Sequence, residues 1–373
     1  MSASVSASAP YREDLAHALR VVHAASLLTK TVLRSLQNNV SAETKADDSP
    51  VTIADFAAQA LIISALHAVY PTDDFLGEES ADQLRKNEGL AERVWQLVLQ
   101  AKENAAQSGA VQLDALVYPA SRNEMLDAID RGTNTQISSG RVWVMDPVDG
   151  TATFMTGNQY AVCLCLLVDG VQQVAVIGCP NLGLDPVDPS SKVHEDLVDQ
   201  AGFGVVLSAV RGQGTHVRSM HSDGLGEARK IEHRQGGEKG SSELDFIEST
   251  LGKTSLSQTE HRAVAEALGA KWPGTVIWSQ QMKYIALTLG ATDVMLRLPL
   301  DRSRYTHVWD HAGGQLLFQE VGGIIKDIDG KTIDFSHGRR VLGENNYGMI
   351  ATQPSAFGKV NQTVNDVLAR RTL

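Results

Sequence analysis

Two apolar runs joined by Asp169-Gly170 restrict the folding of this chain more than any other feature. Residues 162–168 are all apolar, and residues 171–177 are mostly so. An Asp-Gly pair between two such runs favours a tight turn, because glycine readily adopts the positive φ angles that these turns require. The sequence therefore predicts a β-hairpin here. A second hairpin is predicted around Gly212, between residues 204–210 and 215–218.

A third run, the mostly apolar residues 141–145, ends in an acidic turn with the sequence Asp146-Pro147-Val148-Asp149-Gly150-Thr151. Pro147 forces a turn, which returns Asp149 to the same side as Asp146. Two carboxylates and the Val148 carbonyl are the hard oxygen ligands that Mg²⁺ prefers. The N–H groups of Gly150 and Thr151 would open a helix, where free amides attract phosphate. A simpler interpretation is that Asp149 caps this helix and Asp146 ends a strand, and the motif alone does not decide between the two.

Apolar spacing predicts the other elements. Helices are expected over residues 13–38, from a capping box at Thr52 to Pro71, and over 90–99, 260–268, 283–289 and 310–320. Short strands are expected at 75–76, 246–248 and 293–298, and residues 324–325 are expected to enter a hairpin around Asp329-Gly330.

The length of 373 residues exceeds what one hydrophobic core usually serves, so two domains are expected. A polar, Gly-rich stretch from 221 to 242 indicates the boundary. We expect a disordered tail at 1–12, an N-terminal α+β metal and phosphate domain at 13–223, and a C-terminal α/β domain at 224–373. Residues 84–135 look like an insertion or lid within the first domain.

Charge and composition exclude some classes of partner. The formal net charge of −11 disfavours non-specific binding to nucleic acid or anionic membranes. No apolar run is long enough to span a bilayer, and the N-terminal residues lack a signal-peptide pattern. Three cysteines indicate a reducing compartment, and Cys163 and Cys165 are expected to be buried thiols. We therefore expect a cytoplasmic protein that binds neither nucleic acid nor membrane.

Further acidic residues fall at the ends of predicted elements. Asp55 fits a helix capping box, Glu78 lies in an acidic loop, and Asp310 fits a helix N-cap, so each has a purely structural explanation. Element ends are also where side chains from distant segments can meet. Because clustered carboxylates repel one another, their convergence would imply a cation between them.

Taken together, these stretches resemble the inositol monophosphatase superfamily of Mg²⁺-dependent, lithium-sensitive phosphomonoesterases. Their order and approximate spacing match from about Leu15 to Ile350. The matching motifs are Val51-Thr52-Ile53-Ala54-Asp55, Gly77-Glu78-Glu79-Ser80, Trp143 to Thr151, and Trp309-Asp310-His311-Ala312-Gly313-Gly314. The resemblance implies an α/β/α/β/α sandwich with a large antiparallel sheet in the N-terminal part and a smaller mixed sheet in the C-terminal part.

Within the superfamily the chain is most similar to the 3′(2′),5′-bisphosphate nucleotidase branch. Residues 48–52, 157–164, 178–182 and 296–299 carry this similarity. The branch removes the 3′-phosphate of adenosine 3′,5′-bisphosphate, a reaction of sulfur metabolism, and PAPS (3′-phosphoadenosine 5′-phosphosulfate) is a further expected substrate. We expect a monomer with a small phosphorylated substrate as its partner.

The resemblance also implies residue roles. Two or three Mg²⁺ ions would be held by Glu78, Asp146, the Val148 carbonyl, Asp149 and Asp310. Catalysis would involve Asp55, Thr151 and Glu78, with Thr151 and Asp55 helping to activate the attacking water. Substrate contacts would come from Gly150, Thr151, Ser279, Lys283 and Arg297. From residue chemistry alone, Lys283 would be a solvated helix residue and Arg297 the end of a strand.

Three departures from the branch bear on its substrate. Ala152-Thr153 replaces a usual Lys-Gly pair, Thr254 stands near the position of an expected histidine, and one additional residue separates Ser279 from Lys283. None of them touches a predicted metal ligand. Two alternatives therefore stay open: a phosphatase of inositol phosphates, and a non-catalytic, metal-binding regulatory homologue.

Overall fold

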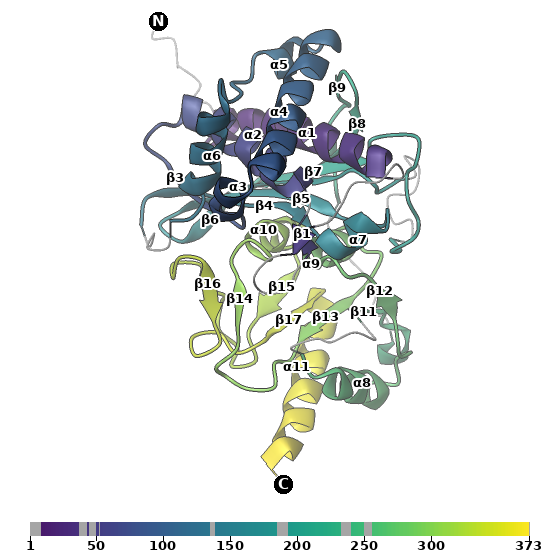
Figure 1. The fold of residues 1–373 in the computed structure, drawn as a ribbon. Coiled ribbons are helices and arrows are strands. Elements are labelled where there is room, and N and C mark those ends of the chain that lie inside the picture. Colours follow the sequence, from purple (N-terminus) through teal and green to yellow (C-terminus); the bar gives the residue numbers. More distant parts are fainter. Residues whose placement is uncertain are drawn as a thin grey trace, which may run out of the picture.

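Five layers in the order α/β/α/β/α make up the fold (Figure 1). The structure is a computed structural model that describes residues 9–36, 43–44, 50–51, 53–134, 139–184, 193–232, 240–249 and 256–372. The layered sandwich that the family resemblance implied is confirmed.

Helices and strands alternate along most of the chain. The helices are α1 (Arg12–Leu36), α2 (Ile53–Val69), α3 (Asp82–Lys86), α4 (Glu88–Gln107), α5 (Val111–Asp114), α6 (Arg122–Arg131), α7 (Thr151–Met155), α8 (Gln258–Ala267), α9 (Gln280–Leu289), α10 (Ala312–Glu320) and α11 (Pro354–Leu368), with 3₁₀ turns η1 (Ser241–Glu243) and η2 (Ala369–Thr372). The strands are β1 (Glu43–Thr44), β2 (Pro50–Val51), β3 (Asp74–Gly77), β4 (Arg141–Asp149), β5 (Ala161–Val168), β6 (Val171–Cys179), β7 (Val205–Val210), β8 (Thr215–His221), β9 (Gly224–Leu225), β10 (Arg229–Lys230), β11 (Phe246–Glu248), β12 (Thr275–Val276), β13 (Val294–Arg297), β14 (Tyr305–His307), β15 (Ile324–Lys326), β16 (Arg340–Leu342) and β17 (Met349–Thr352).

The larger sheet has the strand order β10-β8-β7-β6-β5-β4-β3, with β9 paired to β8. It is antiparallel as predicted, except that β3 runs parallel to β4. Both predicted hairpins are present, as β5–β6 and β7–β8. Asp169 and Gly170 have φ angles of 51° and 76°, so the Asp-Gly turn adopts the positive φ angles that a tight hairpin requires. The thiols of Cys163 and Cys165 are buried within β5.

Helix α2 lies at the centre of the first helical layer. It packs against α1, α4, α6 and β4, and apolar residues on all its sides are buried. Residues 84–135 largely form α4, α5 and α6, and side chains such as Leu90 and Ile129 join the same core. These helices therefore help to stabilise α2, and a lid function for them stays a prediction.

The smaller sheet is mixed, with the order β12-β11-β13-β17-β15. Strand β11 is parallel to β12 and β13, and β17 is antiparallel to β13 and β15. Helices α9 and α10 lie between the two sheets, and α8 and α11 cover the outer face (Figure 1). The site described below forms where α9 and α10 begin.

The hairpin predicted after residues 324–325 is wrong. Strand β15 pairs with β17, not with a strand that directly follows it. The chain between them turns at Asp327, whose buried carboxylate accepts hydrogen bonds from Lys331 N at 2.6 Å and Asn346 Nδ2 at 3.0 Å, and its strand β16 pairs with β14.

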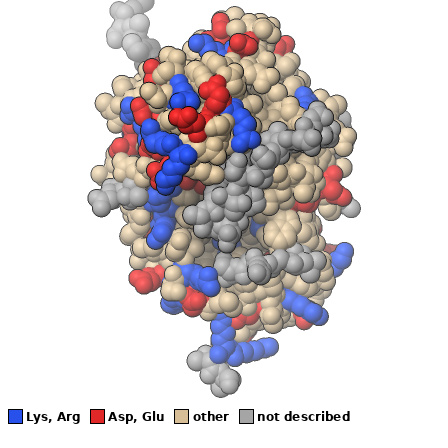
Figure 2. Space-filling view, viewed as in Figure 1, with Lys and Arg blue, Asp and Glu red and all other residues tan. Residues whose placement is uncertain are grey.

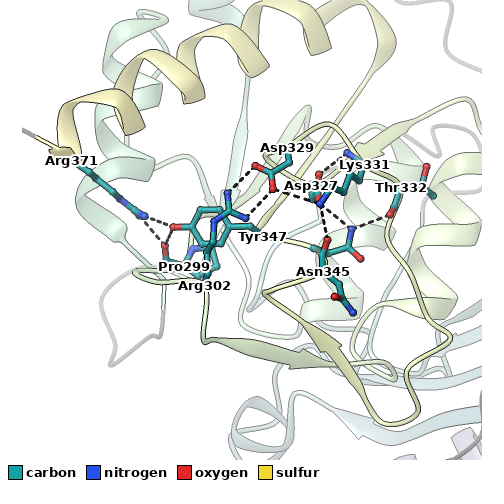
Figure 3. Close-up of polar contacts among 10 residues, drawn as sticks. Pro299, Arg302, Asp327, Asp329, Lys331, Thr332, Asn345, Tyr347 and Arg371 are labelled. Carbon is teal, nitrogen blue, oxygen red and sulfur yellow. Dashed lines mark hydrogen bonds and ion pairs between the residues drawn. The ribbon is translucent and has the colours of Figure 1, made fainter.

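The C-terminal end is attached to the smaller-sheet half by Arg371 in η2. Its guanidinium donates to the Pro299 carbonyl at 2.9 Å and to the Tyr347 hydroxyl (Figure 3). It also pairs with Glu260. Nearby, Arg302 pairs with Asp329 at 2.9 Å. These contacts tie the end of the chain to the body of the protein.

The domain boundaries stay a prediction. Strands β9 and β10 follow the proposed division after residue 223, yet they still pair with the larger sheet. Of the tail predicted at 1–12, residues 1–8 lie outside the described residues, and Arg12 already begins α1.

The surface charge and the hydropathy of the helices bear on which partners the protein can bind. Acidic and basic side chains are interspersed on the face shown in Figure 2. None of the helices in the described parts of the chain combines the length and apolar character that crossing a membrane requires. The expectation that no nucleic acid binds stays a prediction.

Candidate metal centre

Strand β4 presents two of the predicted ligands at its end. Asp146 pairs with Cys163 of β5 and Asp149 with Ala161, and the register shifts between these two pairs. Such a bulge changes the direction in which side chains point. Asp146 and Asp149 are 2% and 7% exposed, so both carboxylates lie inside the protein.

Asp310 joins these two residues from the other half of the chain. One carboxylate oxygen from each of Asp146, Asp149 and Asp310 can be chosen so that all three atoms lie within 4.8 Å of one another. The interpretation of Asp310 as an N-cap is wrong, because α10 begins at Ala312 and His311 occupies the cap position. The Asp310 carboxylate instead accepts a hydrogen bond from Thr306 Oγ1 at 3.3 Å.

The interpretation of Asp149 as the cap of the helix that follows it is also wrong. Gly150, with φ 96°, precedes α7, and the Asp149 carboxylate contacts α9 instead. It accepts hydrogen bonds from Ser279 Oγ at 2.5 Å and from the backbone N–H groups of Gln281 at 2.5 Å and Gln280 at 3.3 Å. The N-terminus of α9 thus stabilises the negative charge of Asp149.

The raised pKa values of the three aspartates show that their burial close together disfavours the ionised carboxylates. Burial, followed by the charge of Glu78 and then those of Asp149 and Asp310, raises the pKa of Asp146 far above its usual range. Burial and Asp310 raise the pKa of Asp149 to about 7, although the hydrogen bonds from α9 oppose the shift. Burial and Glu78 raise the pKa of Asp310 to about 6. Without a cation, the ionised form of the cluster is therefore energetically unfavourable. The cluster suits a hard divalent cation bound through oxygen.

Glu78 and Asp55 lie close enough to act on this cluster. Glu78 follows the end of β3, which is parallel to β4, so the two strand ends are neighbours. Asp55 lies in the first turn of α2 and is fully buried. The charges of both residues raise the pKa of Asp146. Thr52, the first residue of the predicted capping box, lies outside the described residues.

Thr151 begins α7, and its hydroxyl donates to the Val148 carbonyl at 3.2 Å. Two predicted functional groups are therefore in contact. Of the neighbouring residues that depart from the nucleotidase branch, Ala152 is exposed and Thr153 is buried, with Oγ1 2.7 Å from the Gln159 carbonyl. Thr153 therefore packs into the turn that supports α7, and its position gives no sign of a substrate contact.

The two predicted basic residues also lie near the cluster. Lys283 is 6% exposed, which corrects the interpretation of it as a solvated lysine, and its ammonium donates to Ser249 Oγ. Burial, followed by the charge of Arg297, lowers the pKa of Lys283 to about 8. Arg297 donates to Gln280 Oε1 at 2.6 Å and to Thr306 Oγ1 at 3.3 Å. A role for either residue in substrate binding stays a prediction.

Sequence reasoning missed the polar contacts that support this cluster. Gln281 donates from its backbone N–H to Asp149 and from Nε2 to the Trp309 carbonyl at 2.6 Å, and its Oε1 accepts from Gly314 N at 2.9 Å. The sequence carries no signal for such a role, because the complete burial of Gln281 is evident only from the structure. Thr254, near the position of the expected histidine, lies outside the described residues.

Comparisons with known proteins identify the family. The chain matches the inositol monophosphatase family over residues 11–97 and 104–369. It is 38% identical to a 3′(2′),5′-bisphosphate nucleotidase of Emericella nidulans, over 96% of this chain and 98% of that protein. It is 36% identical to a 3′(2′),5′-bisphosphate nucleotidase of Schizosaccharomyces pombe, over 95% of each chain. The structure of an inositol monophosphatase from Anabaena shares the fold, with a TM-score of 0.55, 16% identity and 95% coverage of both chains. The chain belongs to the inositol monophosphatase family.

Proposed function

We propose that this protein is a Mg²⁺-dependent, lithium-sensitive phosphomonoesterase that removes the 3′-phosphate of adenosine 3′,5′-bisphosphate, with PAPS as a further substrate. The convergence of Asp146, Asp149 and Asp310 is the observation that carries this proposal. The names of the Emericella and Schizosaccharomyces relatives support the choice of a bisphosphate nucleotide over an inositol phosphate.

The predicted ligand set would hold two or three Mg²⁺ ions. It consists of Glu78, Asp146, the Val148 carbonyl, Asp149 and Asp310. Bound Mg²⁺ would neutralise the charge of the phosphoryl group and activate water. The all-oxygen donor set and the raised pKa values of the aspartates support this assignment.

Residues around the ions would orient water and substrate. The Thr151 hydroxyl donates to the Val148 carbonyl, so its lone pairs can still accept a hydrogen bond from the attacking water. Asp55 would assist from the first turn of α2. The N–H groups of Gly150 and Thr151 would bind phosphate oxygens, as free amides at a helix start do.

The second phosphate of the substrate would bind basic residues on the smaller-sheet side. Lys283 and Arg297 suit this role because they lie beside the acidic cluster, where the charge of each acts on one of its aspartates. Ser279 was also predicted to contact substrate, but its hydroxyl donates to Asp149. Its contribution would therefore be indirect, through the orientation of that carboxylate.

The Asp146→Asn variant tests the proposal. The amide has the shape of the carboxylate but lacks its charge, so we expect a folded protein that releases no phosphate. Unfolding curves serve as the control for folding. Undiminished turnover by this variant at saturating Mg²⁺ would refute the site assignment.

A substrate panel tests the specificity. Adenosine 3′,5′-bisphosphate, PAPS and inositol phosphates should be compared as substrates, with and without millimolar lithium. A preference for inositol phosphates would favour the alternative phosphatase. Metal binding without hydrolysis of any compound would favour the non-catalytic alternative.

A further inference from the structure

Arg339 connects the two ends of the predicted ligand set. It directly precedes β16 in the smaller-sheet half, and its guanidinium reaches across to the larger-sheet half. One terminal nitrogen donates to the Gly132 carbonyl at 2.8 Å and the other to the Glu78 carbonyl at 3.2 Å. The Gly132 carbonyl also accepts from Gly77 N at 2.8 Å, so Arg339 contacts Glu78 directly and the preceding Gly77 through Gly132.

The same residue holds the segment that leads to Asp310. The Arg339 carbonyl accepts from Val308 N at 3.1 Å. Its guanidinium carbon lies 4.5 Å from the centre of the Trp309 ring. His307 also stacks on this ring, with a centroid distance of 4.5 Å and an interplanar angle of 6°. Trp309 is therefore in contact with both a guanidinium and an imidazole.

These contacts complete a chain of interactions around the acidic cluster. Asp149 accepts from Gln281 N, and the Gln281 side chain donates to the Trp309 carbonyl. The Arg339 guanidinium lies over the Trp309 ring and donates a hydrogen bond to the Glu78 carbonyl. Residues from both halves of the fold are thus joined next to Asp149 and Glu78, and at Trp309, which directly precedes Asp310.

We propose that Arg339 is a positioning residue that sets the separation of Glu78 and Asp310 and thereby the metal affinity of the site. This inference rests on the proposed function, because it assumes that both acids hold the ions. The planar guanidinium suits the role, since it can donate two hydrogen bonds in fixed directions while it stacks on an aromatic ring. A lysine could restore a hydrogen bond to one carbonyl but could not reproduce the stacked fork.

The neighbouring Arg340 provides a matched control. It also lies over an aromatic ring, with its guanidinium carbon 4.1 Å from the centre of Tyr305. Tyr305 belongs to β14, which pairs with β16, so this contact stays within one small hairpin-like pair of strands. The Arg340→Ala variant removes a similar side chain and a similar cation–π contact without altering the support of Glu78.

The experiment compares the full-length wild type with Arg339→Ala, Arg339→Lys and Arg340→Ala. Two quantities are measured: the Mg²⁺ concentration that gives half-maximal phosphate release, and the Mg²⁺-induced rise in the unfolding midpoint, which needs no activity. Contacts that orient metal ligands typically contribute 10–100-fold to metal affinity. We therefore expect Arg339→Ala to raise the half-saturating Mg²⁺ concentration about tenfold or more, with most of kcat recovered at saturating Mg²⁺. Arg339→Lys should be intermediate, and Arg340→Ala should match the wild type.

The outcomes separate this inference from the proposed function. A wild-type Mg²⁺ response in Arg339→Ala, by both measurements, would overturn the positioning role. If that variant does not fold, Arg339→Lys decides, and an unchanged Mg²⁺ response there has the same meaning. If the wild type releases no phosphate but is stabilised by Mg²⁺, the proposed function fails and the midpoint shifts still test Arg339. If Mg²⁺ does not change the unfolding midpoint of the wild type, both the proposed function and the positioning role of Arg339 are overturned.

Discussion

Removing one charge from the acidic cluster should stabilise the metal-free protein while it abolishes activity. We choose Asp310→Asn because the amide keeps an oxygen that can accept the hydrogen bond from Thr306. The substitution therefore changes charge more than shape. Asp149 would be a poorer choice, since three groups at the start of α9 donate to its carboxylate.

The pKa of Asp310 gives the size of the expected gain in stability. Burial and Glu78 raise it from 3.8 to about 6. Each pKa unit corresponds to 1.36 kcal/mol, so ionised Asp310 destabilises the folded state by at most about 3 kcal/mol. Unfolding entropy near 2.1 cal/mol/K per residue converts about 1–3 kcal/mol into a rise in midpoint of roughly 1–4 °C for a chain of this length.

The pH dependence has a definite sign. Because the folded-state pKa of Asp310 is raised, its penalty is complete well above pH 6 and absent below about pH 4, where the carboxyl is protonated in both states. Asp310→Asn should therefore have the higher unfolding midpoint at pH 8 in EDTA, and this advantage should shrink towards zero as the pH falls to 4.

The assay is thermal unfolding in EDTA and in Mg²⁺, together with phosphate release. With Mg²⁺, the wild type should gain stability and the variant should gain much less, and activity should fall more than about 100-fold, beyond the loss typical of an outer contact. A variant that is less stable than the wild type at pH 8 in EDTA would refute the electrostatic argument. A full Mg²⁺ response in the variant would refute its role as a ligand.

Two further substitutions probe the substrate side and the C-terminal anchor. Lys283→Gln keeps a donor for Ser249 but removes the charge. The KM for adenosine 3′,5′-bisphosphate should therefore rise about 10–100-fold, which corresponds to the loss of a hydrogen bond to a charged group. An equal rise in KM for a nucleotide with one phosphate would contradict binding of the second phosphate by Lys283. Arg371→Ala removes the contacts to Glu260 and the Pro299 carbonyl, and should lower the unfolding midpoint by roughly 1–3 °C with unchanged half-saturating Mg²⁺; an unchanged midpoint would show that these contacts do not stabilise the protein.

Local patterns predicted much of the fold. The hairpin at Asp169-Gly170 and the second one near Gly212 follow from turn chemistry and apolar runs, which act over a few residues. The five-layer order depended on the family resemblance, because no local pattern states which face of a sheet a helix covers. The pairing of β15 with β17 was missed for the same reason, since residues 327–348 separate the two strands and include β16, which pairs with β14.

The acidic ligands were easier to find than the residues that support them. Recognisable motifs contain Asp146, Asp149 and Asp310. Helix α10, which was expected to begin at residue 310, begins at Ala312. Arg339 makes its contacts with Glu78 and Gly132 across more than two hundred residues of chain, at sequence separations of 261 and 207. Periodicity and capping rules describe near neighbours, so they carry no information about such a contact. The burial of Lys283 was hidden in the same way, because α9 is buried against other segments of the chain, among them the distant strand β5.

The most direct test of the central claim is anomalous diffraction from crystals grown with Mn²⁺ in place of Mg²⁺. The account predicts anomalous peaks bonded to oxygens of Asp146, Asp149 and Asp310, and loss of those peaks in Asp146→Asn. Crystals that show Mn²⁺ bound elsewhere, or no ion among these three carboxylates, would contradict it.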